Sequence, residues 1–199
     1  MYELLVLGLL MRWPLYAYLI ADITNHIIGP WEKISRGSLS ALLKKLEQAG
    51  LLEPGDPARV PFPSARASQV FAITLAGRAR FSQLMMDTTS NPGTYQRIFR
   101  IKALHLEFLP PRDQLYLVEH YLYYCQTGVR YLRTRSHILA TSPVKVETPG
   151  DAFLTTALDL MEVGAQAWEL ELAWAERLRE RILSQMPEYA RKMGEEDHA

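Results

Sequence analysis

The sequence of 199 residues is poor in cysteine and in long apolar runs, and both shortages limit what it can be. Its single cysteine, Cys125, cannot form an internal disulfide framework or a cysteine-rich zinc site, so we expect a reducing, cytoplasmic location. No apolar run approaches the ~20 residues that span a bilayer. The run at residues 4–11 follows Glu3, where a secretory signal would carry positive charge, so we expect no membrane association.

Recognisable catalytic and metal-binding patterns are also missing from the sequence. None of the histidines pairs with a carboxylate at zinc-ligand spacing, and we find no Gly-rich phosphate loop, nucleophile elbow or paired-carboxylate motif. We therefore predict no cofactor, no metal site and no enzymatic activity. Cys125 is interpreted as a buried, small apolar residue rather than a redox sensor.

The net charge of the whole chain is zero, but the charges are unevenly divided. Residues 1–86 carry nine bases and six acids, a net charge of +3, whereas residues 87–199 carry a net charge of −3. The first part is therefore better suited to an anionic partner such as DNA, although many ordinary domains are equally basic.

Residues 1–87 have the pattern of a small helical domain that carries a β-hairpin. We predict helices over residues 2–11, 14–26 and 36–49, the third capped by Ser35 and ended by Gly50. Two strands, at residues 51–54 and 69–74, flank an extended basic tip, and another helix begins after Thr74. This order is typical of a winged helix-turn-helix, whose recognition helix enters the major groove of DNA.

The third predicted helix has one apolar and one polar face. Leucines at i, i+3, i+4 and i+7 form the apolar stripe, and the opposite face is small or polar, with lysines in its middle. Hydroxyls can bond phosphates or base edges, and lysines neutralise phosphates; an ordinary solvated face is the alternative. We predict DNA contacts from this helix and the hairpin tip at Arg36, Ser38, Ser40, Lys44, Lys45, Arg59, Ser64 and Arg66.

Four motifs in this part of the chain resemble the PadR transcriptional regulators. They are Leu-Val-Leu-Gly-Leu-Leu at residues 5–10, Gly-Ser-Leu-Ser-Ala-Leu at 37–42, Leu-Glu-Gln-Ala-Gly-Leu-Leu at 46–52 and Val-Phe-Ala-Ile-Thr-Leu-Ala-Gly at 70–77. Pro14 and Trp31 also fall where that family has Pro and Trp. The resemblance implies a DNA-binding regulator, more often a repressor, that responds to a small aromatic effector.

The sequence departs from the PadR pattern at three places. Ala17 replaces a glycine before Tyr18, Ser40-Ala41 replaces Tyr-Pro, and Ser68-Gln69 replaces a basic pair. These departures leave open an alternative, in which the protein is a winged-helix dimer that has lost DNA recognition and binds a ligand or a protein partner.

Residues 94–190 are predicted to form a second, helical domain after a linker at residues 88–93. We expect helices over residues 95–109, 113–140 and 151–186. The last is long, about 54 Å at 1.5 Å per residue, and it carries an apolar stripe with heptad spacing, so a partner must bury it. We predict a homodimer, with an intramolecular hairpin as the alternative, through Leu154, Leu158, Met161, Ala165, Trp168 and Leu172.

The predicted fold is therefore mainly α, with an N-terminal winged helix-turn-helix and a long-helix dimerisation domain. In the long-tailed branch of the PadR family, the C-terminal helices likewise mediate dimerisation. Aromatic residues are plentiful in the second half of the chain, and they suit either a core and interface or a pocket for a planar aromatic effector.

Overall fold

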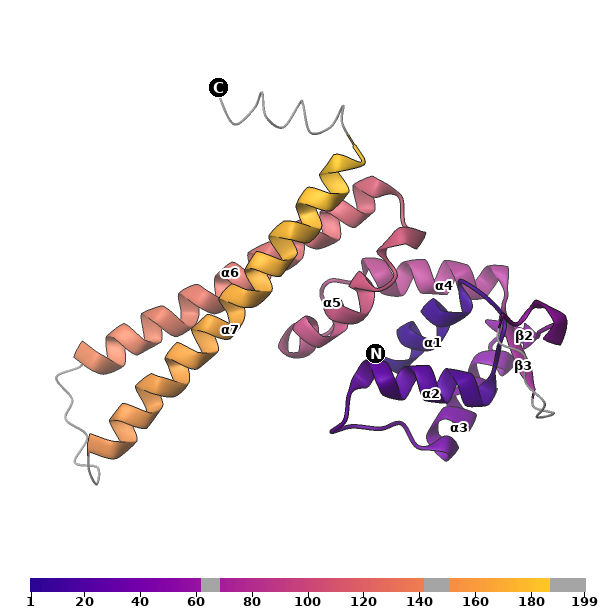
Figure 1. The fold of residues 1–199 in the computed structure, drawn as a ribbon, viewed down its shortest axis with the longest axis horizontal. Helices are drawn as coiled ribbons and strands as arrows, with labels where there is room; N and C mark the ends of the chain where they lie inside the picture. The colour runs from indigo at the N-terminus through magenta and orange to yellow at the C-terminus, as the bar shows by residue number, and fades with distance from the viewer. Residues whose placement is uncertain (62–68, 142–150, 187–199) are drawn as a thin grey trace. The chain divides into compact units, whose positions relative to one another are not determined.

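The computed structural model describes residues 1–61, 69–141 and 151–186, which divide into two compact units (Figure 1). The first unit comprises residues 1–109, and the second begins at Pro110. Helices dominate, and the strands of the first unit form one small antiparallel sheet. The predicted fold class, mainly α with an N-terminal winged helix, is confirmed.

Three helices form the body of the first unit. They are α1 (Tyr2–Leu10), α2 (Ala17–Ile28) and α3 (Arg36–Gln48). Residues 4–10 of α1 are all buried, because this helix contacts α2, the helix after the sheet and the central strand. On α3, Leu39, Leu43 and Leu46 are buried, as the predicted leucine stripe requires.

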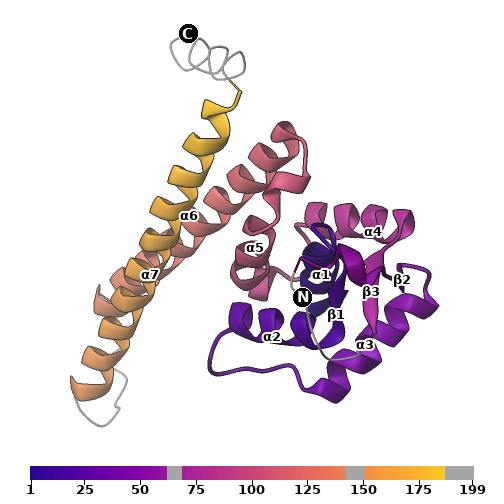
Figure 2. The ribbon, with the colours of Figure 1, turned by 45° about the vertical axis from the view of Figure 1, so that its right-hand side comes forward.

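A sheet of three short strands packs beside α1, and Figure 2 shows the strands side by side. The central strand is β3 (Val70–Ile73), flanked by β1 (Leu15–Tyr16) and β2 (Leu52–Pro54). The prediction of a helix start at residue 14 was wrong. Residues 15 and 16 are extended because they pair with β3, with Leu15 opposite Phe71, and α2 begins only afterwards.

The remaining elements of the first unit are helical. A 3-10 turn, η1 (Pro57–Arg59), follows β2, and α4 (Leu75–Met86) follows β3. The hydroxyl of Thr74 accepts a hydrogen bond from the N–H of Gly77 at 3.0 Å, which confirms the predicted cap of α4. A second 3-10 turn, η2 (Pro92–Thr94), leads into α5 (Tyr95–Ala103).

The helix predicted over residues 95–109 is interrupted after α5 and gives way to a 3-10 turn, η3 (Leu106–Phe108). Arg12, just beyond α1, holds this segment: its guanidinium donates to the carbonyl oxygen of Leu104 at 2.9 Å and forms an ion pair with Glu107. The second domain was predicted over residues 94–190, whereas the first compact unit extends to Leu109 and so includes α5 and η3.

The second unit is a hairpin of two long antiparallel helices, α6 (Pro111–Thr141) and α7 (Asp151–Ser184). The ring of Trp168 meets Tyr124 edge-on at 5.4 Å, and a Cβ at Gly128 would lie only 2.9 Å from the Trp168 indole. The Tyr121 hydroxyl donates to Glu171 at 2.5 Å. In the part of the chain that the structure describes, no helix has the length and apolarity to cross a membrane.

Candidate nucleic-acid interface

A side-chain cap fixes the N-terminus of α3. The Ser35 hydroxyl oxygen accepts a hydrogen bond from the N–H of Ser38 at 3.1 Å, and the same hydroxyl donates to the Ser38 hydroxyl at 2.9 Å. Ser38 therefore keeps its own hydroxyl hydrogen for a bond to an outside acceptor. Both side chains are exposed, so the capped end of the helix is accessible to a ligand.

The loop that leads into α3 is held from two sides. The amide of Asn25, on α2, bonds both the N–H and the carbonyl of Ile34, at 2.8 and 3.4 Å. The Glu32 carboxylate accepts from the Tyr2 hydroxyl at 2.6 Å and forms an ion pair with Arg97. These two hydrogen-bonding partners lower the pKa of Glu32. The loop between α2 and α3 is thus held by Asn25 of α2 on one side and by Tyr2 and Arg97, outside the two helices, on the other.

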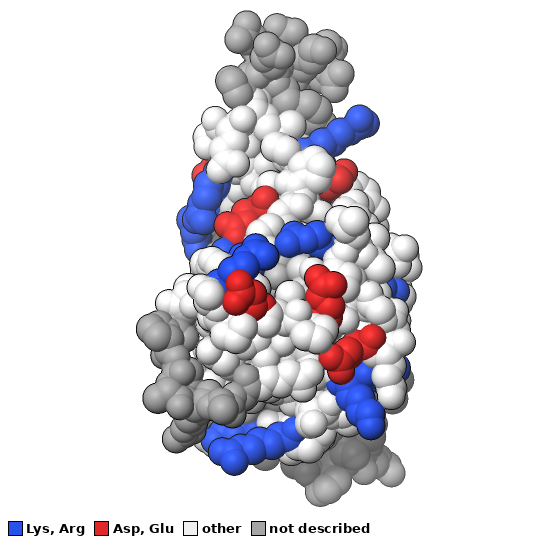
Figure 3. Space-filling model, turned by 90° about the vertical axis from the view of Figure 1, so that its right-hand side faces the viewer, with Lys and Arg blue, Asp and Glu red and all other residues white. Residues whose placement is uncertain are grey.

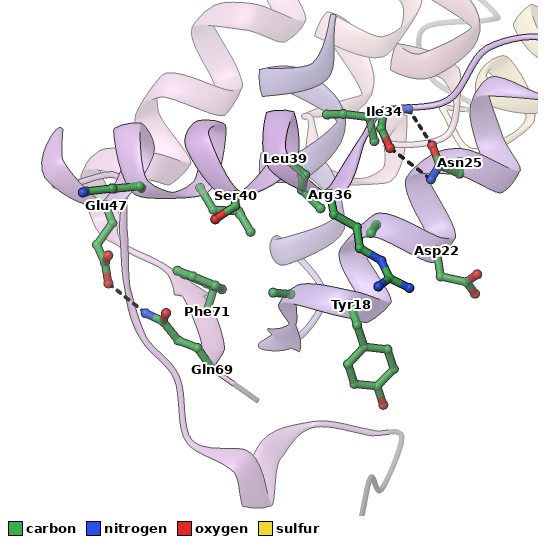
Figure 4. A pocket seen from close by; sticks show the side chains of 14 residues that line it. Tyr18, Asp22, Asn25, Ile34, Arg36, Leu39, Ser40, Glu47, Gln69 and Phe71 are labelled. Carbon is green, nitrogen blue, oxygen red and sulfur yellow. Dashed lines mark hydrogen bonds between the residues drawn. The ribbon is translucent and has the colours of Figure 1, made fainter. Parts of the chain in front are cut away.

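An open groove of about 930 Å³ lies between α2, α3 and β3 (Figure 4). Arg36 reaches from α3 towards Tyr18 and Asp22 of α2, and Ser40 lies farther along α3. The lining residues come from three places: Ala17, Tyr18, Ala21, Asp22 and Asn25 of α2; Ile34, Arg36, Leu39, Ser40, Leu43, Lys44 and Glu47 of α3 and the loop before it; and Gln69 and Phe71 of β3 and its start.

The groove carries charges of both signs. Arg36 and Lys44 line it together with Asp22 and Glu47, so the cations are balanced by carboxylates. Figure 3 shows the same mixture on the face that includes β2 and β3, where basic and acidic side chains are interspersed on a mostly uncharged surface. Attraction for a polyanion therefore depends on a few individual cations rather than on a broad basic patch.

The structure brings five of the eight predicted DNA-contacting residues together. Arg36, Ser38, Ser40, Lys44 and Lys45 all lie on α3, and all five are exposed. Of these, Arg36, Ser40 and Lys44 line the groove.

The other three predicted DNA-contacting residues belong to the hairpin. Arg59 is exposed on η1 but does not line the groove. Ser64 and Arg66 lie outside the described residues.

Sequence reasoning missed the pair that links the sheet to α3. The Gln69 side-chain amide donates to the Glu47 carboxylate at 3.3 Å, and the Gln69 carbonyl accepts from the N–H of Ala17 at 3.2 Å. Gln69 therefore joins the start of β3 to both helices of the groove. Because Gln69 and Glu47 are 22 residues apart, no local sequence pattern predicts the hydrogen bond between them.

The stripe predicted for dimerisation lies along α7, where much of it faces α6. Ala165 is buried, Trp168 packs on Tyr124 and Gly128, and Leu172 is half-buried. This is the intramolecular hairpin that the sequence left open as an alternative. Leu154, near the start of α7, is the most exposed of the six predicted residues.

No protein-family model and no curated protein matches this sequence. The chain is similar to solved structures at low identity. It is 19% identical to Bacillus subtilis PadR in complex with operator DNA, with a TM-score of 0.39, over 90% of this chain and 98% of that one.

Two further solved structures show a similar level of likeness. For Bacillus subtilis PadR in complex with p-coumaric acid, identity is 20%, the TM-score is 0.38, and the match covers 87% of this chain and 98% of that one. For the Vibrio cholerae virulence activator AphA, identity is 14%, the TM-score is 0.38, and the match covers 93% of this chain and 99% of that one. Because the identities and TM-scores are low, we base the function on this chain's own residues.

Proposed function

We propose that the chain is a PadR-type transcriptional regulator that binds double-stranded DNA as a homodimer and acts as a repressor. The observation that carries the proposal is α3: three of its four leucines are buried in the first unit, and its hydroxyl and cationic side chains are exposed beside an open groove. A capped helix with such a face can enter a major groove. Its exposed Gly37 and Ala41 permit close approach to the base edges.

The side chains divide into two tasks. Ser38, Ser40 and Lys44 would meet the base edges, which specify sequence. Arg36 and Lys45 would bond phosphates, which set position and supply most of the non-specific affinity. On the wing, we assign Arg59, Ser64 and Arg66 to phosphates as well.

A gel-shift titration on the DNA upstream of the chain's own gene tests the proposal. Tight binding that resists non-specific competitor DNA is the expected result. The alternative function, a winged-helix dimer without DNA recognition, predicts that competitor removes all binding. In that case the exposed face of α3 is an ordinary solvated surface.

A double variant tests the assignment of α3 itself. Lys44→Ala with Lys45→Ala should weaken binding and flatten the dependence of log affinity on log salt by about 1.8, for the two phosphate contacts that Lys45 makes in a dimer. The matched control, Arg130→Ala with Arg135→Ala, removes the same charge from exposed positions of α6 and should change neither value. Equal behaviour of the two double variants would reject the assignment.

We also propose that a small aromatic acid releases the DNA. A hollow of about 360 Å³ between α6 and α7 supports this, because Arg133 and His137 line it beside the apolar Leu132 and Met161. Arg133 forms an ion pair with Glu169, and Glu162 also lines the hollow, so a ligand carboxylate would have to take the place of Glu169 while its ring meets the apolar side chains. Phenolic acids should raise the melting temperature and reduce operator binding; a panel that does neither removes the effector from the proposal.

A further inference from the structure

The loop before the capping residue of α3, residues 29–34, carries a carboxylate with partners on two distant helices (Figure 1). The Tyr2 hydroxyl, on α1, donates to Oε1 of Glu32 at 2.6 Å. The guanidinium of Arg97, on α5, forms an ion pair with the other carboxylate oxygen. Glu32 thus ties the loop to helices that lie 30 and 65 residues away in the chain.

The described residues offer this loop few other anchors. Of the loop residues, only Ile34 is buried, and Trp31 is 97% exposed. Among the described residues, side chains bond the loop at two places: at Glu32, and at Ile34 through the amide of Asn25. The bonds at Ile34 come from α2 itself, so the contacts of Glu32 are the ones that tie the loop to α1 and α5.

The two partners stabilise the charged form of the Glu32 carboxylate. The hydrogen bond from Tyr2, followed by the one from Arg97, lowers the pKa of Glu32, and the same carboxylate raises the pKa of Tyr2. The side chains of Arg97 and Glu32 are 45% and 42% exposed, and an ion pair of this kind adds little to global stability. We therefore expect its effect in the placement of the loop rather than in the free energy of unfolding.

The place of the loop decides where α3 begins. Glu32 precedes Ser35, the cap of α3, by three residues and Ser38, the first proposed base contact, by six. Recognition helices read base edges with their N-terminal residues. A binding constellation has to be held within about 0.5 Å of its productive geometry, so a loose loop before the cap costs base contacts.

We propose that Glu32 is a positioning residue for DNA binding: it holds the loop to α1 and α5 and so places the first turn of α3 against the major groove. The inference rests on the proposed function, because α3 is a recognition helix only if the chain binds DNA. The negative charge of Glu32 itself opposes binding to a polyanion. Loss of that charge alone would strengthen DNA binding, whereas loss of positioning weakens it, so the two effects have opposite signs.

Glu32→Ala tests the sign on the DNA upstream of the chain's own gene. Affinity for this operator DNA should fall about tenfold, the size of one lost base contact, while affinity for non-specific DNA should not fall. Glu53→Ala is the matched control, because the Glu53 carboxylate is exposed on β2 and has no hydrogen-bond or ion-pair partner among the described residues. The control should bind the operator at least as tightly as the natural chain. A Glu32→Ala chain that follows the control would overturn the inference.

A charge exchange separates positioning from a defect in folding. Glu32→Arg combined with Arg97→Glu reverses the ion pair and keeps the net charge of the chain. The double variant should recover most of the operator affinity that the two single variants lose, because each exchanged side chain again has its partner. A double variant that binds no better than the weaker single one would refute the role of the pair.

Hydrogen exchange measures the holding of the loop without DNA. In Glu32→Ala, the amides of residues 29–38 should exchange several-fold faster than in the natural chain, while those of α4 should not change. Unchanged exchange would overturn the inference, and so would faster exchange with full operator affinity. A natural chain that binds no DNA, with faster exchange in Glu32→Ala, would refute the proposed function and with it the part of Glu32 in DNA binding, although the contact itself would stand.

Discussion

At the scale of single residues, Gly77 explains why a glycine closes the fourth motif of the sequence. A Cβ there would lie 2.2 Å from the carbonyl oxygen of Leu51. That oxygen also accepts the N–H of Thr74 at 3.1 Å, so it is part of the fixed backbone between α3 and β2. We expect Gly77→Ala to lower the free energy of unfolding by about 1–3 kcal/mol, through overpacking.

Urea unfolding measures this cost, and Gly93→Ala is its control. A Cβ at Gly93 meets nothing within 4 Å, so the control should unfold at nearly the natural urea concentration. If both alanine variants unfold alike, the approach of Gly77 to Leu51 is not a rigid contact.

His105 makes the stability of the first unit depend on pH. Its ring is buried against Gly8 and Phe81, with no hydrogen-bond partner for either nitrogen in the described part of the chain. Burial, and then the charge of Arg12, lowers the pKa of His105 to about 4. The folded chain thus keeps the ring neutral while the unfolded chain binds a proton below a pH of about 6.5, so stability is lost as the pH falls from about 6.5 towards 4.

At pH 5, this single group should cost about 2 kcal/mol of the free energy of unfolding relative to pH 7. His105→Leu removes the group, so the loss between pH 7 and pH 5 should shrink by that amount in urea titrations. His137→Leu, at an exposed position, should follow the natural chain. An identical pH response of all three chains would contradict the role of the buried imidazole.

At the scale of elements, the sequence predicts those whose signals are local. The leucine stripe and the cap at Ser35 lie within α3 itself, and both are found in the structure. Strand β1 was not predicted because it has only two residues. These residues are extended because they pair with β3, more than fifty residues later in the chain. The break after α5 depends on Arg12, from the other end of the unit, so the local pattern does not show it.

The same distinction applies to the site. The five predicted residues of α3 are exposed because the buried leucines turn one side of the helix inward, although the five spread around the rest of the helix and only Arg36, Ser40 and Lys44 line the groove. The bond between Gln69 and Glu47 joins two elements and could not be predicted without the fold. On α7, heptad spacing predicts that a stripe is covered but not by which helix, and α6 proved to cover the predicted one.

The cap of α3 gives a prediction at this scale. Ser35→Ala removes the acceptor of the Ser38 N–H and should cost about 1 kcal/mol of the free energy of unfolding. Ser35→Asn, which supplies another good capping side chain, should restore most of the loss in the same urea titration. A loss that asparagine leaves unchanged would show that the hydroxyl acts through another contact.

At the scale of the whole molecule, the helical hairpin and the proposed DNA-binding face belong to different units. Helices α6 and α7 form the second unit and α3 lies in the first, so residues of one unit can be altered without changing those of the other. A dimer matters for DNA because paired half-sites about one turn apart bind a two-fold protein with both recognition helices. Each subunit adds its own phosphate contacts, and their number sets the salt dependence.

Leu170 is 75% exposed on α7, and we expect the proposed homodimer to bury it. Leu170→Glu should therefore change DNA binding without altering any residue of α3. As a monomer, the variant engages one half-site, so the slope of log affinity against log salt should fall to about half of the natural value, and operator affinity should fall with it. Fluorescence anisotropy over a series of salt concentrations measures both, with Leu75→Glu, at an 86% exposed position of α4, as the control. On a DNA that carries a single half-site, the natural and variant chains should bind nearly alike. A monomeric variant that keeps the full slope on the whole operator would show that one winged helix makes all the phosphate contacts, and pairing of the hairpins would then have no part in DNA recognition.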